Sequence, residues 1–331
     1  MKRKRPIDVL RDSAFSMEVG TPEEGSLEEF MKLEDRLLTI KKKAVYEFIL
    51  ADTIDPERTN VAIPNSQQRV LDIGSESPIL CRILLTADTL FKPVYLQHVI
   101  DCKAAMSAAF RATLELAAMS FDRDQLLSEI EEALSGVRDE EMTTGFKIPV
   151  IPNLQARSKA ILYRGHDAIK AMLDIVRLFY GPKITHADSL LKYAEKNIEP
   201  EDSFRQFIEK AVPVLRFIWN MRNAVAHPKP TTRILVQNFS LRADGTLDVP
   251  SIEIIHPDTP QTAVPAIDLI DSIIESLQAI FEELSVYLCD RHAKHGEFQI
   301  GVAEVPQHRR RHDHVRFSYV VNLGGQWQPL G

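Results

Sequence analysis

Residues 219 to 230, with the sequence WNMRNAVAHPKP, bring together side chains that can bind phosphate groups and transfer protons. Arg222 can stabilise negative charge on phosphoryl oxygens, and His227 can exchange a proton near neutral pH. Asn223 precedes His227 by four residues, or about one helical turn, so its amide can orient the imidazole ring or bind phosphate. The segment is therefore either a polar helix end or a small active site.

An apolar stripe predicts that this segment ends a helix spanning about 202 to 227. At about 100° per residue, one side of that helix carries the core residues Val214, Phe217, Ile218, Met221 and Val225. The other side carries Arg216, Trp219, Arg222, Asn223, Ala226 and His227. Pro228 ends the helix, so His227 lies at its carbonyl end, where the helix dipole favours a protonated imidazole. We therefore expect an exposed polar face, with Arg216 and Lys229 as candidate substrate-binding cations.

Composition limits the classes of partner. The chain has 331 residues, 44% of them hydrophobic and 26% charged, which is typical of a globular protein. Its net charge of -7 gives no bulk attraction to nucleic acid, so any RNA contact must be local. Three widely spaced cysteines without metal-ligand pairing favour the reducing cytoplasm, and no apolar run is long enough to cross a membrane.

Helical periodicity dominates the rest of the sequence. It predicts helices at 26 to 52, 79 to 119, 123 to 135, 154 to 180, 185 to 197 and 264 to 291. The last helix has an a/d seam that suits either a bundle core or a dimer contact. The Asp244-Gly245 pair predicts a β-hairpin at about 233 to 256, inserted before that helix. The predicted fold class is therefore all-α: an antiparallel helical bundle with an inserted β-hairpin.

The motif Arg222-Asn223-x-x-x-His227 resembles that of the HEPN family, whose active members carry an Arg, usually a polar neighbour, and a His near a helix end. The resemblance is clearest over 154 to 292 and extends to a domain of 79 to 292. It implies a metal-independent endoribonuclease, with Arg222, Asn223 and His227 in a cleft between two copies of the chain, no cofactor, and a toxin or defence role. Residues 1 to 78 are then a helical extension and linker that can meet a protein partner, and 293 to 331 a basic tail.

A binding role is the main alternative. Arg222, Asn223 and His227 could cap the helix and bond a neighbouring loop, in an inactive HEPN-like module that binds nucleotide, RNA or protein. Two other enzyme classes fit poorly. The segment RVLDIGSESP resembles the opening of a methyltransferase but lacks the further glycines, and DVPSIEII lacks the lysine of a PD-(D/E)xK nuclease. Three tail histidines, His308, His312 and His314, are more typical of a mobile basic tail than of a metal site.

Overall fold

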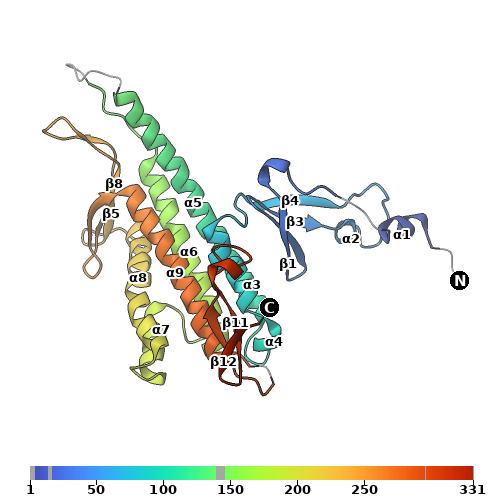
Figure 1. Cartoon of the computed structure of the whole chain (residues 1–331). Helices are drawn as coiled ribbons and strands as arrows, with labels where there is room; N and C mark the ends of the chain where they lie inside the picture. The colour runs from blue at the N-terminus through green and yellow to red at the C-terminus, as the bar shows by residue number, and fades with distance from the viewer. Residues whose placement is uncertain (1–3, 14–16, 139–145, 295, 331) are drawn as a thin grey trace.

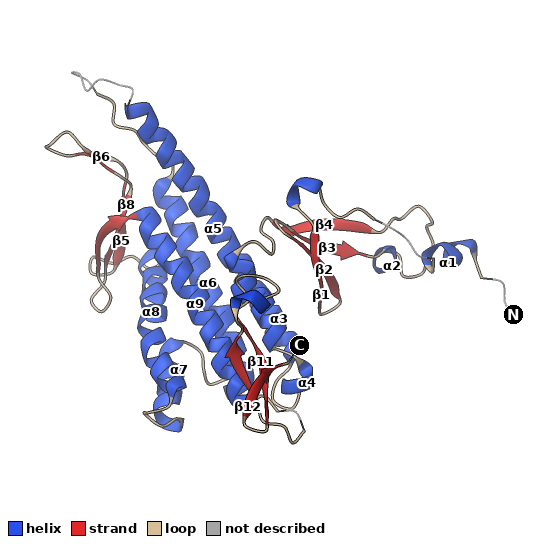
Figure 2. Cartoon of the chain, in the orientation of Figure 1, coloured by secondary structure: helices blue, strands red, loops and turns tan. Residues whose placement is uncertain are grey.

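The computed structural model describes residues 4–13, 17–138, 146–294 and 296–330. About 50% of the structure is helical and about 20% is strand, the strands forming four separate antiparallel sheets. The protein is therefore mixed α and β, and the prediction of an all-α fold is wrong. Figure 2 shows the long helices gathered in one elongated bundle, with the N-terminal sheet to one side of it. In the described residues, no helix is long and apolar enough to span a membrane.

An antiparallel sheet replaces the helix predicted at 26 to 52. Its strands are β1 (Leu27–Leu33), β2 (Arg36–Lys41), β3 (Val45–Ile49) and β4 (Ser66–Leu71), hydrogen-bonded in that order. The buried side chains Met31 and Leu33 alternate with exposed ones, as do those of a strand that has one face in a core. Glu34 turns the chain with a φ of 56°, which a continuous helix does not allow. Three short elements flank the sheet: α1 (Pro6–Arg11), η1 (Pro22–Glu24) and α2 (Ala51–Ile54).

Five long helices build the bundle: α5 (Cys102–Arg138), α6 (Leu154–Tyr180), α7 (Ala187–Asn197), α8 (Ser203–Ala226) and α9 (Ala266–His292). The periodicity located the last four of these to within about two residues. The helix predicted at 79 to 119 is instead broken into a π-helix, η2 (Leu80–Leu85), α3 (Thr86–Leu90) and α4 (Pro93–Leu96) before α5 begins. Proline at 93 disfavours helical backbone at the residue before it, which explains the break.

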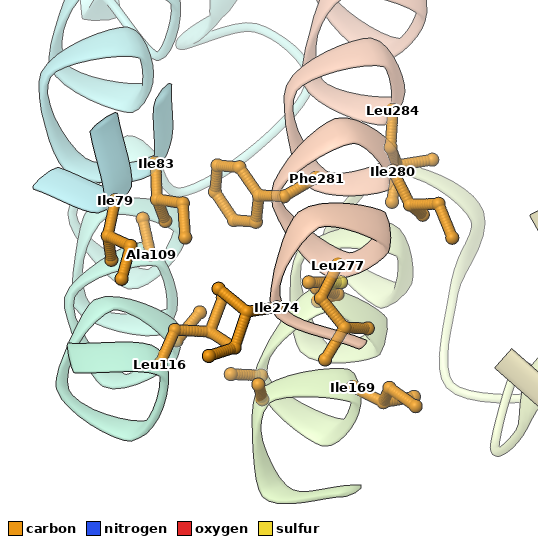
Figure 3. Close-up of a cluster of buried hydrophobic side chains, with 14 of the residues drawn as sticks. Ile79, Ile83, Ala109, Leu116, Ile169, Ile274, Leu277, Ile280, Phe281 and Leu284 are labelled. Atoms are coloured by element: carbon orange, nitrogen blue, oxygen red, sulfur yellow. The ribbon is translucent and has the colours of Figure 1, made fainter. Parts of the chain in front are cut away.

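Helix α9 forms the centre of the bundle. It contacts α5, α6 and α8 and also η2, α3 and β10. Figure 3 shows its side chains Leu277 and Phe281 among apolar residues of η2, α5 and α6, such as Ile83 and Leu116. Its apolar seam therefore packs inside one chain. Of the two predicted uses of the seam, a bundle core and a dimer contact, the structure shows the bundle core.

Two small sheets are formed by the segment that connects α8 to α9 in the sequence. Strands β5 (Arg233–Gln237), β8 (Ser251–Ile255) and β9 (Gln261–Pro265) form the first, in the order β5-β8-β9. Strands β6 (Ser240–Leu241) and β7 (Leu247–Asp248) form the second, around a turn in which Gly245 has a φ of 84°. The predicted hairpin is therefore present, extended by β9. Figure 1 shows these strands at one end of the bundle, beside the end of α8.

The predicted basic tail is folded. Strands β10 (Ile300–Glu304), β11 (Phe317–Leu323) and β12 (Gln326–Pro329) form an antiparallel sheet, with a short helix, η3 (Gln307–Arg309), after β10. The hydroxyl of Tyr319 donates to the carbonyl of Leu90 over 2.5 Å. Arg316 pairs with Glu282 of α9, a carboxylate that is fully buried and also accepts from Arg82 over 3.0 Å. These contacts join the C-terminal sheet to the bundle.

Candidate functional site

The motif lies where α8 ends and the chain turns towards β5. Asp202 begins this helix by accepting a hydrogen bond from the backbone N–H of Phe204 over 2.8 Å. Ala226 is its last residue. His227 follows with φ -132° and ψ 62°, so its backbone has left the helix, although its N–H still donates to the carbonyl of Asn223 over 2.9 Å. The predicted helix end is therefore observed, and proline at 228 accounts for it.

Arg222 is half-buried against helix α6. Its guanidinium carbon lies 5.5 Å from the centre of the Tyr163 ring, within the range of a cation–π contact. One terminal nitrogen lies 3.4 Å from the amide oxygen of Asn223, a long contact that holds the group only weakly. The Nε atom is buried, and no acceptor for it is found in the described residues. Arg222 and Asn223 are therefore only partly exposed, where an exposed face was expected, and helix α6 packs against Arg222.

A pair of rings joins the same two helices about one turn away. The imidazole of His166 on α6 packs edge-on to the indole of Trp219 on α8, with ring centres 4.4 Å apart. Residue numbers rise along α6 and fall along α8 between these pairs, so the two helices run antiparallel. His166 is buried, and burial is the main cause that lowers its pKa, followed by the charge of Lys170. Its ring is therefore held neutral at physiological pH.

His227 itself faces solvent. Its side chain makes no hydrogen bond or ion pair with the other residues that the structure describes, Asn223 included. An imidazole that capped the helix or tied down a loop would show such a bond. The imidazole is therefore exposed, with no partner among the described residues. No hydrogen bond between the side chains of Asn223 and His227 supports the predicted role of Asn223 in orienting the ring.

The two predicted substrate-binding cations have different surroundings. Arg216 pairs with Asp188 of α7, with its Nε 2.8 Å and one terminal nitrogen 2.5 Å from the same carboxylate oxygen. This pair links α7 to α8, so Arg216 has a structural partner that would compete with phosphate. Lys229 is exposed at the start of a tight turn, closed by backbone bonds with Thr232. Lys229 therefore lies beside His227 with its side chain in solvent.

Most arginines of the bundle are neutralised by a carboxylate. Arg123 pairs with Asp271, Arg157 with Glu129 and Arg164 with Asp122. For Arg222, by contrast, no carboxylate partner is found within residues 4–13, 17–138, 146–294 and 296–330. The positive charge of Arg222 is thus held by an aromatic ring and stays available to an anion.

Reasoning from the sequence missed the residues that α6 brings to the site. Tyr163, His166, Asp167 and Lys170 recur at steps of three, one and three, which places them on one side of a helix. That polar and aromatic stripe, within a helix otherwise apolar on its buried side, was the available indication. It could not show that the stripe meets Arg222, because the register between two helices depends on the whole core.

The structure describes the surroundings of the tail histidines. Among the residues that the structure describes, no group of three or more histidine, cysteine or acidic side chains is placed to hold a metal ion. His312 instead lies with its Nε2 3.2 Å from the carboxylate of Glu29, a residue of β1. Comparison with models of known families, with curated proteins and with solved structures found no match.

Proposed function

We propose that the chain is a metal-independent endoribonuclease that acts through Arg222, Asn223 and His227, in the manner of the HEPN family that its motif resembles. One observation carries the proposal. Arg222 is a half-buried cation with no carboxylate partner in the described residues, and it lies one and a half turns before the solvent-exposed imidazole of His227. A phosphate bound there would meet a fixed positive charge and a group that can transfer protons.

The proposed reaction balances without an added reagent. The 2′-OH of RNA attacks the adjacent phosphorus, and its proton passes to a neutral imidazole. The bond from phosphorus to the 5′-oxygen breaks, and that oxygen takes a proton from a protonated imidazole. The products are a 2′,3′-cyclic phosphate and a 5′-OH. Arg222 stabilises the charge that develops on the non-bridging oxygens, and Lys229 and the amide of Asn223 hold neighbouring phosphates.

Two copies of the chain are part of the proposal, because one chain supplies one His227 while the reaction uses a base and an acid. Two α8 ends facing each other would provide one imidazole for each role. The α9 seam is not the surface for this contact, since it is buried within one chain. Arg216 is left out of the RNA contacts, since Asp188 occupies it. The cytoplasm is the proposed compartment, and all three cysteines are free and buried.

Cleavage of a labelled single-stranded RNA in excess EDTA tests the proposal. We expect RNA to be cut to products with 2′,3′-cyclic phosphate ends, and the matching DNA to remain intact because it lacks the 2′-OH. His227→Ala should lower the rate about 10² to 10⁴-fold, and Arg222→Ala about 10² to 10³-fold. The melting temperature of His227→Ala should not change, because its side chain is exposed.

Lys183→Ala is the control variant, since Lys183 is an exposed cation in the loop between α6 and α7. Cleavage of DNA, or loss of activity in EDTA, would show that the mechanism is wrong. RNA that is bound in an Arg222-dependent way but never cut would favour the alternative, an inactive HEPN-like binding module. A toxin or defence role is tested separately, by asking whether expression slows cell growth and whether His227→Ala relieves it.

A further inference from the structure

The C-terminal sheet carries a half-exposed aromatic ring on the face opposite Tyr319. Cross-strand partners point to the same side of a sheet, and the register pairs Gly301 with Val320, Val320 with Pro329, and Asn322 with Trp327. The indole of Trp327 lies over Gly301, 3.5 Å from where a Cβ would stand, and keeps 49% of its surface exposed. The opposite face of the sheet carries Tyr319, which is buried against α3. Trp327 is therefore a ring that rests on the sheet and stays open to solvent.

A hollow of about 560 Å³ opens beside this ring, lined by Val305, Arg309, Ser318, Trp327, Gln328 and Pro329. Its size is in the range of sites for small organic ligands, which are about 300 to 1,000 Å³. It is flanked by apolar groups and by the hydroxyl of Ser318, which can donate and accept hydrogen bonds. In the described residues, the Ser318 hydroxyl has no hydrogen-bond partner.

Arg309 is the cation of the hollow, and its surroundings differ from those of the two arginines that follow it. Arg310 donates to the carbonyl of Val305 and pairs with Glu304, while Arg311 pairs with Glu29. The side chain of Arg309 has no such partner within the part of the chain that the structure describes. The hollow therefore combines a flat aromatic surface with a positive charge that is not neutralised.

We infer that this hollow binds a nucleotide, with its base stacked on Trp327 and its phosphate on Arg309. Every nucleobase has a flat face that an exposed indole can cover, and Ser318, on the same face of the sheet as Trp327, can bond the edge of the base. Arg309 then supplies the charge that the phosphate needs. A free nucleotide and one unit of a single RNA strand share this chemistry.

The site is distinct from the Arg222 face. Figure 1 shows β11 and β12 near α3 and α4, away from the end of the bundle where β5 follows α8. Nucleotide binding at Trp327 therefore goes beyond the proposed cleavage and does not require it. A strand bound at both places would be held by two separated contacts, whereas a free nucleotide would occupy the hollow alone.

Tryptophan fluorescence tests the inference, because the chain has only Trp219 and Trp327. In a Trp219→Phe chain, emission reports on Trp327 alone. The probes are AMP and a ten-nucleotide oligo(A) with 2′-O-methyl groups, which block attack by the 2′-oxygen and so separate binding from cleavage. We expect saturable quenching, and binding weakened about tenfold or more by Arg309→Ala. Arg311→Ala is the matched control for loss of one charge and should change binding by less than twofold.

Polarisation of labelled oligo(A) checks the stacking contact. Trp327→Leu should weaken binding about tenfold or more, and Trp327→Phe should retain most of it, because a phenyl ring still stacks. Tighter binding of oligo(A) than of AMP would identify a single RNA strand as the ligand. Equal binding of the two would identify a free nucleotide as the ligand. Quenching that never saturates, or an equal effect of Arg309→Ala and Arg311→Ala, would overturn the site. The two proposals can fail separately. If the wild type cuts no RNA but quenching persists, in His227→Ala as well, the proposed cleavage is wrong and the nucleotide site remains.

Discussion

Tyr163 shows how a single ring can prepare a cation for an anionic ligand. A flexible arginine loses side-chain entropy when it binds, at a cost of up to about 2 kcal/mol, unless a neighbour already holds it. A carboxylate would hold Arg222 but would also compete with phosphate. The Tyr163 ring, 5.5 Å from the guanidinium carbon, restrains it without competing. Tyr163 is in this sense a positioning residue for Arg222.

Tyr163→Leu should therefore lower kcat/KM for RNA about fivefold, since a cation–π contact contributes about 1 kcal/mol. Tyr163→Phe should behave like the wild type, because the ring remains. In an Arg222→Ala background, Tyr163→Leu should have no further effect. Tyr193→Leu, which removes a ring on α7 that packs on Tyr180, is the control. An additive effect of Tyr163→Leu and Arg222→Ala would mean that the ring acts through something else.

His166 gives the fold a defined response to pH. Its folded-state pKa is lowered from 6.5, mainly by burial, so the unfolded chain takes up this proton more readily than the folded one. Its stabilising contribution is complete above about pH 6.5 and is lost as the pH falls below it. We expect the urea midpoint to drop between pH 7.5 and pH 5.5, and to drop less in His166→Phe, which keeps a ring against Trp219. Burial also lowers the pKa of His292, which therefore acts in the same direction. If the midpoint of His166→Phe drops as much as that of the wild type, the pH effect comes from His292 or another group.

At the scale of elements, the buried carboxylate of Glu282 is the most sensitive position outside the site. It is fully buried and accepts from Arg82 of η2 and from Arg316 before β11, so three separate segments depend on it. Glu282→Ala leaves both arginines without their shared partner and should cost about 3 to 5 kcal/mol in the free energy of unfolding. Glu283→Ala, at the exposed neighbouring position, should change stability by less than about 0.5 kcal/mol. Chemical denaturation of both variants measures this, and similar midpoints would show that the cluster contributes little.

Long helices could be predicted from the sequence, and short irregular elements could not. Helices α6 and α9 repeat their apolar residues over 27 residues each, so the 3.6-residue period is unambiguous. Over 26 to 52, Phe30, Leu33, Leu37 and Ile40 also fit that period. The buried residues there, Met31, Leu33, Leu38 and Ile40, follow the two-residue period of strands instead. Such short runs fit both periods, and the turn at Glu34 decides between them.

The candidate site could be predicted only in part for a related reason. The motif residues and the helix end are local properties of residues 219 to 230, and both were accessible from the sequence. The half-burial of Arg222 and the pairing of Arg216 with Asp188 depend on which helices lie next to α8. The folded C-terminal sheet was missed because its strands are short and its basic residues, such as Arg310 and Arg316, are typical of a solvated tail.

At the scale of the whole molecule, the proposed chemistry requires two chains. We expect light scattering to give the mass of a dimer at micromolar concentration, and activity per chain to fall when dilution separates the copies. Adding inactive His227→Ala chains should then inhibit wild-type activity by forming mixed dimers. A monomer with full activity would contradict this requirement. Lys183→Ala chains, added in the same amount, should leave the activity unchanged.

The bond from Tyr319 to Leu90 has a consequence for the order in which the molecule forms. The two residues are 229 positions apart in the chain, so a growing polypeptide exposes the α3 surface long before the strand that covers it has been made. Until then the helices of a nascent chain lack one wall, and contacts so distant in sequence form slowly. We therefore expect that side of the nascent chain to be open to proteases and chaperones until β11 has been made.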